Sequence, residues 1–281
     1  MELFGIGDTR LTERDGDIKR YLSDVHRVLH NALLDNFIGL YLHGSLAMGA
    51  FLPSRSDIDI IATLDWPLSD MQREELRHAA SKVPLPSIVS GLDLTLLTTK
   101  TARHPSEDAS WEAAIQVRHV HASQQAQMRD RSDPFLFIDV AIVREYGVAL
   151  AGPRVDESFG PVAAGLITDA CGENCRVWAN RDVFHDPTSG VLNVCRAWRF
   201  LEEGDLVSKV EAGEWAKSRT DKGELVESAV TVGRGDASAI LSHADVKEFC
   251  QGIAGLFEER GFRKAIAAPD TVRSRAEGCP L

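Results

Sequence analysis

The sequence predicts an α+β protein in which an N-terminal mixed sheet flanked by helices is followed by a C-terminal helical bundle. Three observations support this fold class. Short apolar runs ending in turns alternate with helical patterns in the first half, apolar residues recur at three- and four-residue spacing in the second, and glycine-proline segments lie between the halves. The length of 281 residues also favours two domains over one.

The chain begins with a predicted helix, a strand and a tight turn. Apolar residues from Arg10 to Asn36 recur as they do on one face of an amphipathic helix. The apolar run 37–42 predicts a buried strand, because it is short, rich in branched and aromatic residues, and stopped by His43-Gly44-Ser45. A brief helix is expected over 46–50.

Two further strands carry acidic residues among apolar ones. Residues 58–63 alternate as a strand that starts between Asp57 and Asp59, and Asp93 lies at the apolar centre of a third strand, 88–97. A carboxylate in so apolar a setting requires a partner or a function. Helices are predicted over 69–82, 135–146, 165–179, 190–203, 209–217 and 245–260.

The composition excludes several classes of protein. Acidic residues outnumber basic ones 42 to 31, and a net charge of −11 disfavours nucleic acid as a partner. No apolar run is long enough to span a membrane, and no secretory signal precedes the first helix, so we expect a cytoplasmic protein without a membrane partner. The five cysteines lack the spacing of a disulfide framework or a zinc knuckle.

The Gly-Ser turn and the two acids after it form the most informative pattern in the chain. Gly44 and Ser45 offer backbone N–H groups and a hydroxyl that can hold terminal phosphates, and Gly44 lets the backbone approach closely. Asp57 and Asp59 share one face of a strand, because side chains alternate with a period of two. Their carboxylates suit hard cations such as Mg²⁺.

Asp93 completes this group if its strand pairs with the strand at 58–63. It would then either bind metal as a third carboxylate or accept the proton of an acceptor hydroxyl. Divalent cations held by such a cluster polarise the α-phosphorus of a nucleoside triphosphate and stabilise the departing pyrophosphate. The pattern therefore predicts nucleotidyl transfer with two Mg²⁺ ions and the metal ligands Asp57, Asp59 and Asp93.

The motif Gly44-Ser45, Asp57-Ile58-Asp59 and then Asp93 resembles the DNA polymerase β-like nucleotidyltransferase superfamily. From about residue 37 to 217 the chain looks more closely like the aminoglycoside 3″-adenylyltransferase family, which acts on streptomycin and spectinomycin. Further segments occur in the order of that family: Ile138–Ile142, Val148–Pro153, Arg196–Trp198, and Lys209 followed by Ala212–Ala216.

Glycine-proline segments at 151–153 and 160–161 indicate a linker, which divides the chain into a nucleotidyltransferase domain over 1–155 and a helical domain over 156–264. The segment 265–281 is polar with two prolines and is expected to be a flexible tail. The resemblance implies that the helical domain closes on nucleotide and substrate. It implies that Arg196 and Lys209 reach the phosphates of ATP, the co-substrate, and that Asp182 and Asp186 bind a cationic antibiotic. The implied reaction transfers AMP to an antibiotic hydroxyl and releases pyrophosphate. A monomer is expected.

Two departures from the family pattern leave alternatives open. The general base of the family is a glutamate where this chain has Asp93, and an antibiotic-stacking tryptophan of the family falls at Arg118 or His119 here, with Trp111 nearby. The same chemistry on a different small-molecule or protein acceptor is one alternative. A nucleotide-binding or antitoxin-like module without turnover is the other, although such a module has no need of three acids.

Overall fold

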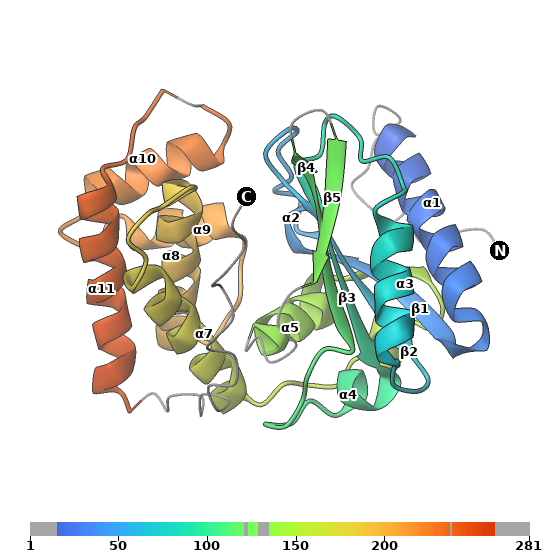
Figure 1. Ribbon diagram of the computed structural model, residues 1–281. Helices are drawn as coiled ribbons and strands as arrows, with labels where there is room; N and C mark the ends of the chain where they lie inside the picture. The colour runs from blue at the N-terminus through green and yellow to red at the C-terminus, as the bar shows by residue number, and fades with distance from the viewer. Residues whose placement is uncertain (1–15, 121–122, 129–134, 237, 262–281) are drawn as a thin grey trace, which may run out of the picture.

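The computed structural model describes residues 16–120, 123–128, 135–236 and 238–261, and within them it has the predicted α+β architecture (Figure 1). The predicted tail over 265–281 lies outside these residues, as do the first residues of the predicted helix 10–36. The strands are β1 (Phe37–His43), β2 (Ile58–Leu64), β3 (Gly91–Thr98), β4 (Ala113–Val120), β5 (Ser123–Met128) and β6 (Val148–Ala151).

Helices surround the sheet and then form the bundle. Those of the sheet region are α1 (Gly16–Leu33), the 3₁₀ turn η2 (Leu34–Asn36), α2 (Gly44–Ala47), α3 (Asp70–Ala80), α4 (Thr99–Arg103), α5 (Leu136–Tyr146) and α6 (Val155–Ser158). The bundle consists of α7 (Ala164–Ala179), α8 (Pro187–Glu203), α9 (Lys209–Ala216), α10 (Gly223–Gly233) and α11 (His243–Glu259). No helix among the described residues has both the length and the apolarity needed to cross a bilayer.

The sheet is mixed, with the strand order β5-β4-β3-β2-β1-β6. Only β2 and β3 run parallel, and the other neighbouring strands are antiparallel. The parallel pairing places Asp59 directly opposite Asp93. The predicted pairing of the two acid-bearing strands is therefore confirmed, and both acids lie at the same end of the sheet.

The alternation of side chains divides the sheet into two differently covered faces. Even-numbered residues of β2, such as Ile58 and Ile60, pack into one core with residues of α1 and α3. The odd-numbered Ile61 belongs to a second core, which contains α5 and the bundle. Because Asp59 shares the face of Ile61, its carboxylate points toward the bundle. Figure 1 shows α1 and α3 on the side of the sheet away from the bundle.

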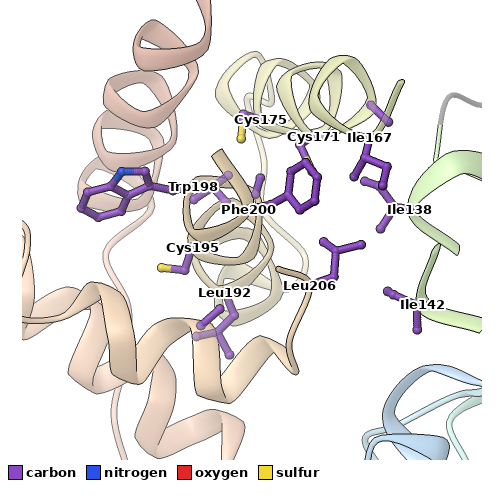
Figure 2. Packing of buried hydrophobic residues seen from close by; sticks show 14 of the residues in the cluster. Ile138, Ile142, Ile167, Cys171, Cys175, Leu192, Cys195, Trp198, Phe200 and Leu206 are labelled. Atoms are coloured by element: carbon purple, nitrogen blue, oxygen red, sulfur yellow. The ribbon is translucent and has the colours of Figure 1, made fainter. Parts of the chain in front are cut away.

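Helix α5 joins the sheet to the bundle. Its side chains Ile138 and Ile142 are buried in the same core as Ile167 of α7 and Leu206, which precedes α9 (Figure 2). Burying apolar side chains of this size contributes roughly 1.5–3 kcal/mol each relative to exposure. This packing holds the bundle against the face of the sheet that carries the acids.

Local signals fix the starts of the two bundle helices nearest the acids. Asp186 caps α8 by accepting a hydrogen bond from the Ser189 backbone N–H at 3.0 Å, and Pro187 occupies the first turn. Ser208 caps α9 by accepting from the Glu211 N–H at 3.2 Å. Because Ser208 is the cap, Lys209 is the first residue of α9, and its side chain extends from the start of the helix.

Candidate active site

The turn between β1 and α2 brings the backbone against a carboxylate. Gly44 has a φ of +64°, a left-handed conformation that favours glycine. A Cβ on Gly44 would collide with the side chain of Asp59. Glycine is therefore required here for two separate reasons, the backbone conformation and the close approach to Asp59.

Three glycine-to-alanine variants separate these two reasons. Gly252→Ala, in α11 with open space around it, is expected to stabilise the protein by about 0.4–1 kcal/mol. Gly204→Ala, with a φ of +77° and no neighbour within 4 Å, should cost about 1–2 kcal/mol. Gly44→Ala should cost more than Gly204→Ala. Chemical denaturation measures all three, and a cost at Gly44 equal to that at Gly204 would show that the contact with Asp59 does not matter.

Ser45 and His43 place polar atoms beside the turn. Within the described part of the chain, the buried Oγ of Ser45 and Nδ1 of His43 have no hydrogen-bond partner. Burial, together with the nearby Arg196, lowers the pKa of His43 to about 3, so the imidazole is uncharged at neutral pH. The Ser45 hydroxyl can donate to an anionic ligand, as the sequence predicts for a phosphate group.

Three carboxylates converge at the ends of β2 and β3. Asp59 lies opposite His43 on one side and Asp93 on the other. Asp57 directly precedes β2, and its Oδ1 accepts a hydrogen bond from the hydroxyl of Ser90. Asp57 and Asp93 are partly exposed, with 30% and 23% of their side chains accessible. The three acids predicted from the sequence therefore lie together at an accessible end of the sheet.

An arginine that the sequence analysis noted only as a departure bridges two of these acids. The Nη2 of Arg118, on β4, donates to Asp57 Oδ2 at 3.0 Å and to Asp93 Oδ1 at 2.7 Å. Burial alone would lower the pKa of Arg118, but the carboxylates of Asp93 and Asp57 raise it above the ordinary value. The guanidinium is thus charged and neutralises part of the acidic cluster.

The pKa of Asp59 is strongly perturbed by its surroundings. Burial raises its pKa well above the ordinary value, and the negative charges of Asp93, Asp57 and Asp139 raise it further. The pKa of Asp57 is also raised, chiefly by burial, although Arg118 opposes the shift. Such an arrangement is stabilised by any cation that binds between the acids.

Two cationic side chains face the acids from the bundle. Arg196 of α8 and Lys209 of α9 line the same cavity as Asp59. Burial lowers the pKa of Lys209, as does Arg196, whereas the charge of Asp59 raises it. Burial likewise lowers the pKa of Arg196, and Asp139 of α5 opposes this. The positive charge of Arg196 thus opposes that of Lys209, and such a pair suits a site for a highly charged anion.

The cavity between the sheet and the bundle has a volume of about 600 Å³. Eight of the nine predicted site residues line it, namely Gly44, Ser45, Asp57, Asp59, Asp93, Asp186, Arg196 and Lys209. Asp182 does not line it, because its side chain is 93% exposed and pairs with Lys247 at 3.1 Å. Only Asp186 of the two predicted antibiotic-binding acids therefore faces the cavity.

Several cavity residues were not predicted from the sequence. Asp139 is the one charged residue in the apolar stretch 136–143 of α5, and this isolated charge was a usable signal. Trp178, for which apolar spacing favours core packing, is only partly buried and lines the cavity. Arg181 covers its ring at 4.0 Å from the ring centre. Trp111 is 1% exposed in the core and offers no ring to a ligand.

The chemistry of the donors fits divalent magnesium. Asp57, Asp59 and Asp93 supply carboxylate oxygens, which Mg²⁺ prefers. The pKa of Asp59 is raised first by burial and then by the negative charges of Asp93 and Asp57, and a bound cation would oppose both effects. Among residues 16–120, 123–128, 135–236 and 238–261, no three acidic, histidine or cysteine side chains are grouped as a ready metal site. Arg118 lies between two of the predicted ligands.

Two family models together match most of the chain. Residues 28–108 match the family model of the nucleotidyltransferase domain, and residues 157–254 match that of the aminoglycoside adenylyltransferase C-terminal domain. An aminoglycoside (3″)(9) adenylyltransferase of Shigella flexneri is 24% identical over 254 residues, which cover 85% of this chain and 94% of that protein. One of Rhizobium radiobacter is 28% identical and covers 72% and 77%.

A solved structure shares the fold. The spectinomycin adenyltransferase AAD(9) from Enterococcus faecialis, determined with ATP and spectinomycin, superposes with a TM-score of 0.69. Its sequence is 16% identical, and the match covers 85% of this chain and 98% of that one. The two proteins therefore share the fold of a sheet packed against a helical bundle.

Proposed function

The chain belongs to the aminoglycoside adenylyltransferase family, because a nucleotidyltransferase domain is followed by the C-terminal domain of that family, and from that premise we propose that it transfers AMP from ATP to a hydroxyl of an aminoglycoside-type antibiotic. The family assignment makes the protein an enzyme of the nucleotidyltransferase type. The proposal adds the Mg²⁺ dependence, the acceptor class and the release of pyrophosphate.

One observation carries the proposal. A single cavity is lined on the sheet side by Asp57, Asp59 and Asp93, and on the bundle side by Arg196 and Lys209. Nucleotidyl transfer requires both sets at once, because cations must neutralise the triphosphate while carboxylates hold metal and take a proton. A surface that only stored nucleotide would need the cations but would gain nothing from crowded acids.

We assign the residues as follows. Arg196 and Lys209 bind phosphate oxygens of ATP, and the Ser45 hydroxyl donates to a terminal phosphate. Asp57 and Asp59, with Asp93 in the alternative ligand role, would hold two Mg²⁺ ions, which would polarise the α-phosphate and stabilise pyrophosphate. The acceptor oxygen bonds to the α-phosphorus while the bond between the α-phosphorus and the oxygen bridging to the β-phosphate breaks. Asp93 receives the proton of the acceptor hydroxyl.

Asp186 is proposed to attract the acceptor. Its backbone and side chain cap α8 at the rim of the cavity, and its carboxylate is exposed there. An aminoglycoside carries protonated amines, so an exposed carboxylate at the entrance favours it electrostatically. The net charge of −11 acts in the same direction, although more weakly.

Pyrophosphate release tests the proposal. Purified protein with MgATP is expected to release pyrophosphate when spectinomycin or streptomycin is present and not when the acceptor is omitted, with an AMP ester of the antibiotic detected by mass spectrometry. If calorimetry detects ATP binding but no aminoglycoside supports release, the acceptor assignment is wrong. Release with another hydroxyl compound would then favour nucleotidyl transfer to a different acceptor.

A further inference from the structure

Arg118 is built into the acidic cluster through four hydrogen bonds. Its Nη1 donates to the backbone carbonyls of Leu92 and Val117, both at 3.0 Å. These two bonds anchor one side of the guanidinium fork. The other nitrogen, Nη2, then points at Asp57 and Asp93 and donates to one oxygen of each.

The sheet makes room for this side chain. Arg118 lies directly opposite Gly91 in the antiparallel pairing of β3 and β4. A Cβ on residue 91 would collide with the Arg118 side chain, so Gly91 allows it to cross the strand toward the acids. The arginine therefore occupies a prepared path, and its contact with the acids is set by the fold.

We propose that Arg118 is an internal competitor for the divalent cation, holding Asp57 and Asp93 together in the metal-free protein and yielding Asp57 when metal binds. Arg118 is in this sense a positioning residue. The inference rests on the proposed metal-dependent function, but its test requires no turnover.

The competition follows from shared oxygens. Nη2 of Arg118 uses Asp57 Oδ2 and Asp93 Oδ1, and a metal ion on those oxygens would meet the hydrogens and positive charge of the guanidinium at contact distance. Asp59 lines the cavity, and among the described residues no ion pair occupies its carboxylate. Metal can enter at Asp59 and must then displace the guanidinium to gain Asp57.

The test measures Mn²⁺ affinity without nucleotide, by electron paramagnetic resonance of the unbound ion. Arg118→Ala is expected to bind Mn²⁺ roughly tenfold more tightly than the unaltered protein, because the competing charge-assisted hydrogen bonds are gone. Its metal-free melting temperature should fall, since the acids lose their cation. Arg118→Lys should fall between the two, because an ammonium keeps the charge but lacks the planar fork.

Two controls keep the result interpretable. Arg55→Ala removes a positive charge from the same cavity, but Arg55 donates to the Val232 carbonyl at 3.2 Å and does not contact the acids. Its Mn²⁺ affinity should rise far less than that of Arg118→Ala. Arg118→Gln keeps an amide that can donate to the backbone carbonyls, and it replaces Arg118→Ala if the alanine variant does not fold.

The outcomes separate this inference from the proposed function. The inference is overturned if the neutral Arg118 variants bind Mn²⁺ no more tightly than the unaltered protein or than Arg55→Ala. Weaker binding in these variants would mean that Arg118 only supports Asp93. If the unaltered protein nevertheless releases pyrophosphate with MgATP, the proposed function stands. If no variant binds Mn²⁺ even with a nonhydrolysable ATP analogue, both are overturned.

Discussion

Asp59→Ala is expected to lower the rate of adenylyl transfer by on the order of a thousandfold or more, because metal-ion stabilisation supplies several kcal/mol to such reactions. Asp59 lies between His43 and Asp93 in the sheet and faces the cavity, so it is the central carboxylate of the cluster. The measurement is the initial rate of pyrophosphate release at saturating MgATP and antibiotic. Asp57→Ala should also lose turnover by orders of magnitude.

Asp65→Ala is the matched control. Asp65 follows the opposite end of β2 and is exposed, away from the cavity. Its replacement removes the same charge from a position next to the same strand, and we expect turnover to be unchanged. If Asp59→Ala retains activity comparable to that of Asp65→Ala, the two-metal assignment is wrong.

Replacing Asp59 should lower turnover but raise the stability of the metal-free protein. The folded-state pKa of Asp59 is raised, by burial and then by Asp93, Asp57 and Asp139. Stability associated with this group is full below the unfolded pKa of about 3.9 and is lost as pH rises through the raised folded value. Asp59→Asn should therefore match the unaltered protein near pH 4 and become the more stable one toward neutral pH, as measured by thermal unfolding in chelator.

Asp93→Asn is expected to lower turnover by about 10²–10⁴-fold, the range for loss of a general base. The amide keeps the shape of the side chain but cannot accept the hydroxyl proton. Mn²⁺ titration of the same variant separates the two roles left open for Asp93. Retained metal binding with lost turnover supports the base role, whereas loss of both supports the ligand role.

Asp93→Glu is the matched variant for this experiment. It restores the carboxylate with one more methylene, the residue type expected from the family resemblance, and should retain far more turnover than Asp93→Asn. The change also lengthens the reach toward Arg118, which now pairs with Asp93 at 2.7 Å. Equal losses of turnover in Asp93→Asn and Asp93→Glu would indicate that the exact position of the carboxylate matters more than its ability to accept a proton.

Much of the fold could be read from periodicity. The strands at 37–42 and 58–63 were predicted to within a residue of β1 and β2, because buried strands carry short apolar runs. The prediction for β3 began three residues early, at 88 instead of Gly91. Helices α7, α8, α9 and α11 were also predicted, since each has apolar residues at helical spacing.

Strands β4, β5 and β6 and helix α10 were not predicted. Strand β5 reads Ser-Gln-Gln-Ala-Gln-Met and lies at the edge of the sheet, where it is held by backbone hydrogen bonds to β4. A polar edge strand has no apolar pattern to reveal it. Strand β6 has four residues, which is too short for a pattern.

The sequence by itself determined the catalytic type of this protein. Asp57 and Asp59 share a face of a strand through its period of two, and the left-handed backbone of the Gly-Ser turn before them favours glycine at position 44. These are local properties, which neighbouring residues impose in any fold that contains the strand and the turn. The family assignment from these motifs is confirmed.

Only the tertiary structure decided which other charges meet the acids. Arg118 reaches Asp57 and Asp93 because β4 pairs with β3 in a register that sets it opposite Gly91. Asp182 is turned to the surface beside Lys247, although it lies four residues from Asp186 in the chain. Pairings of this kind depend on strand order and on helix docking across the core, and the spacing of residues along the sequence contains neither.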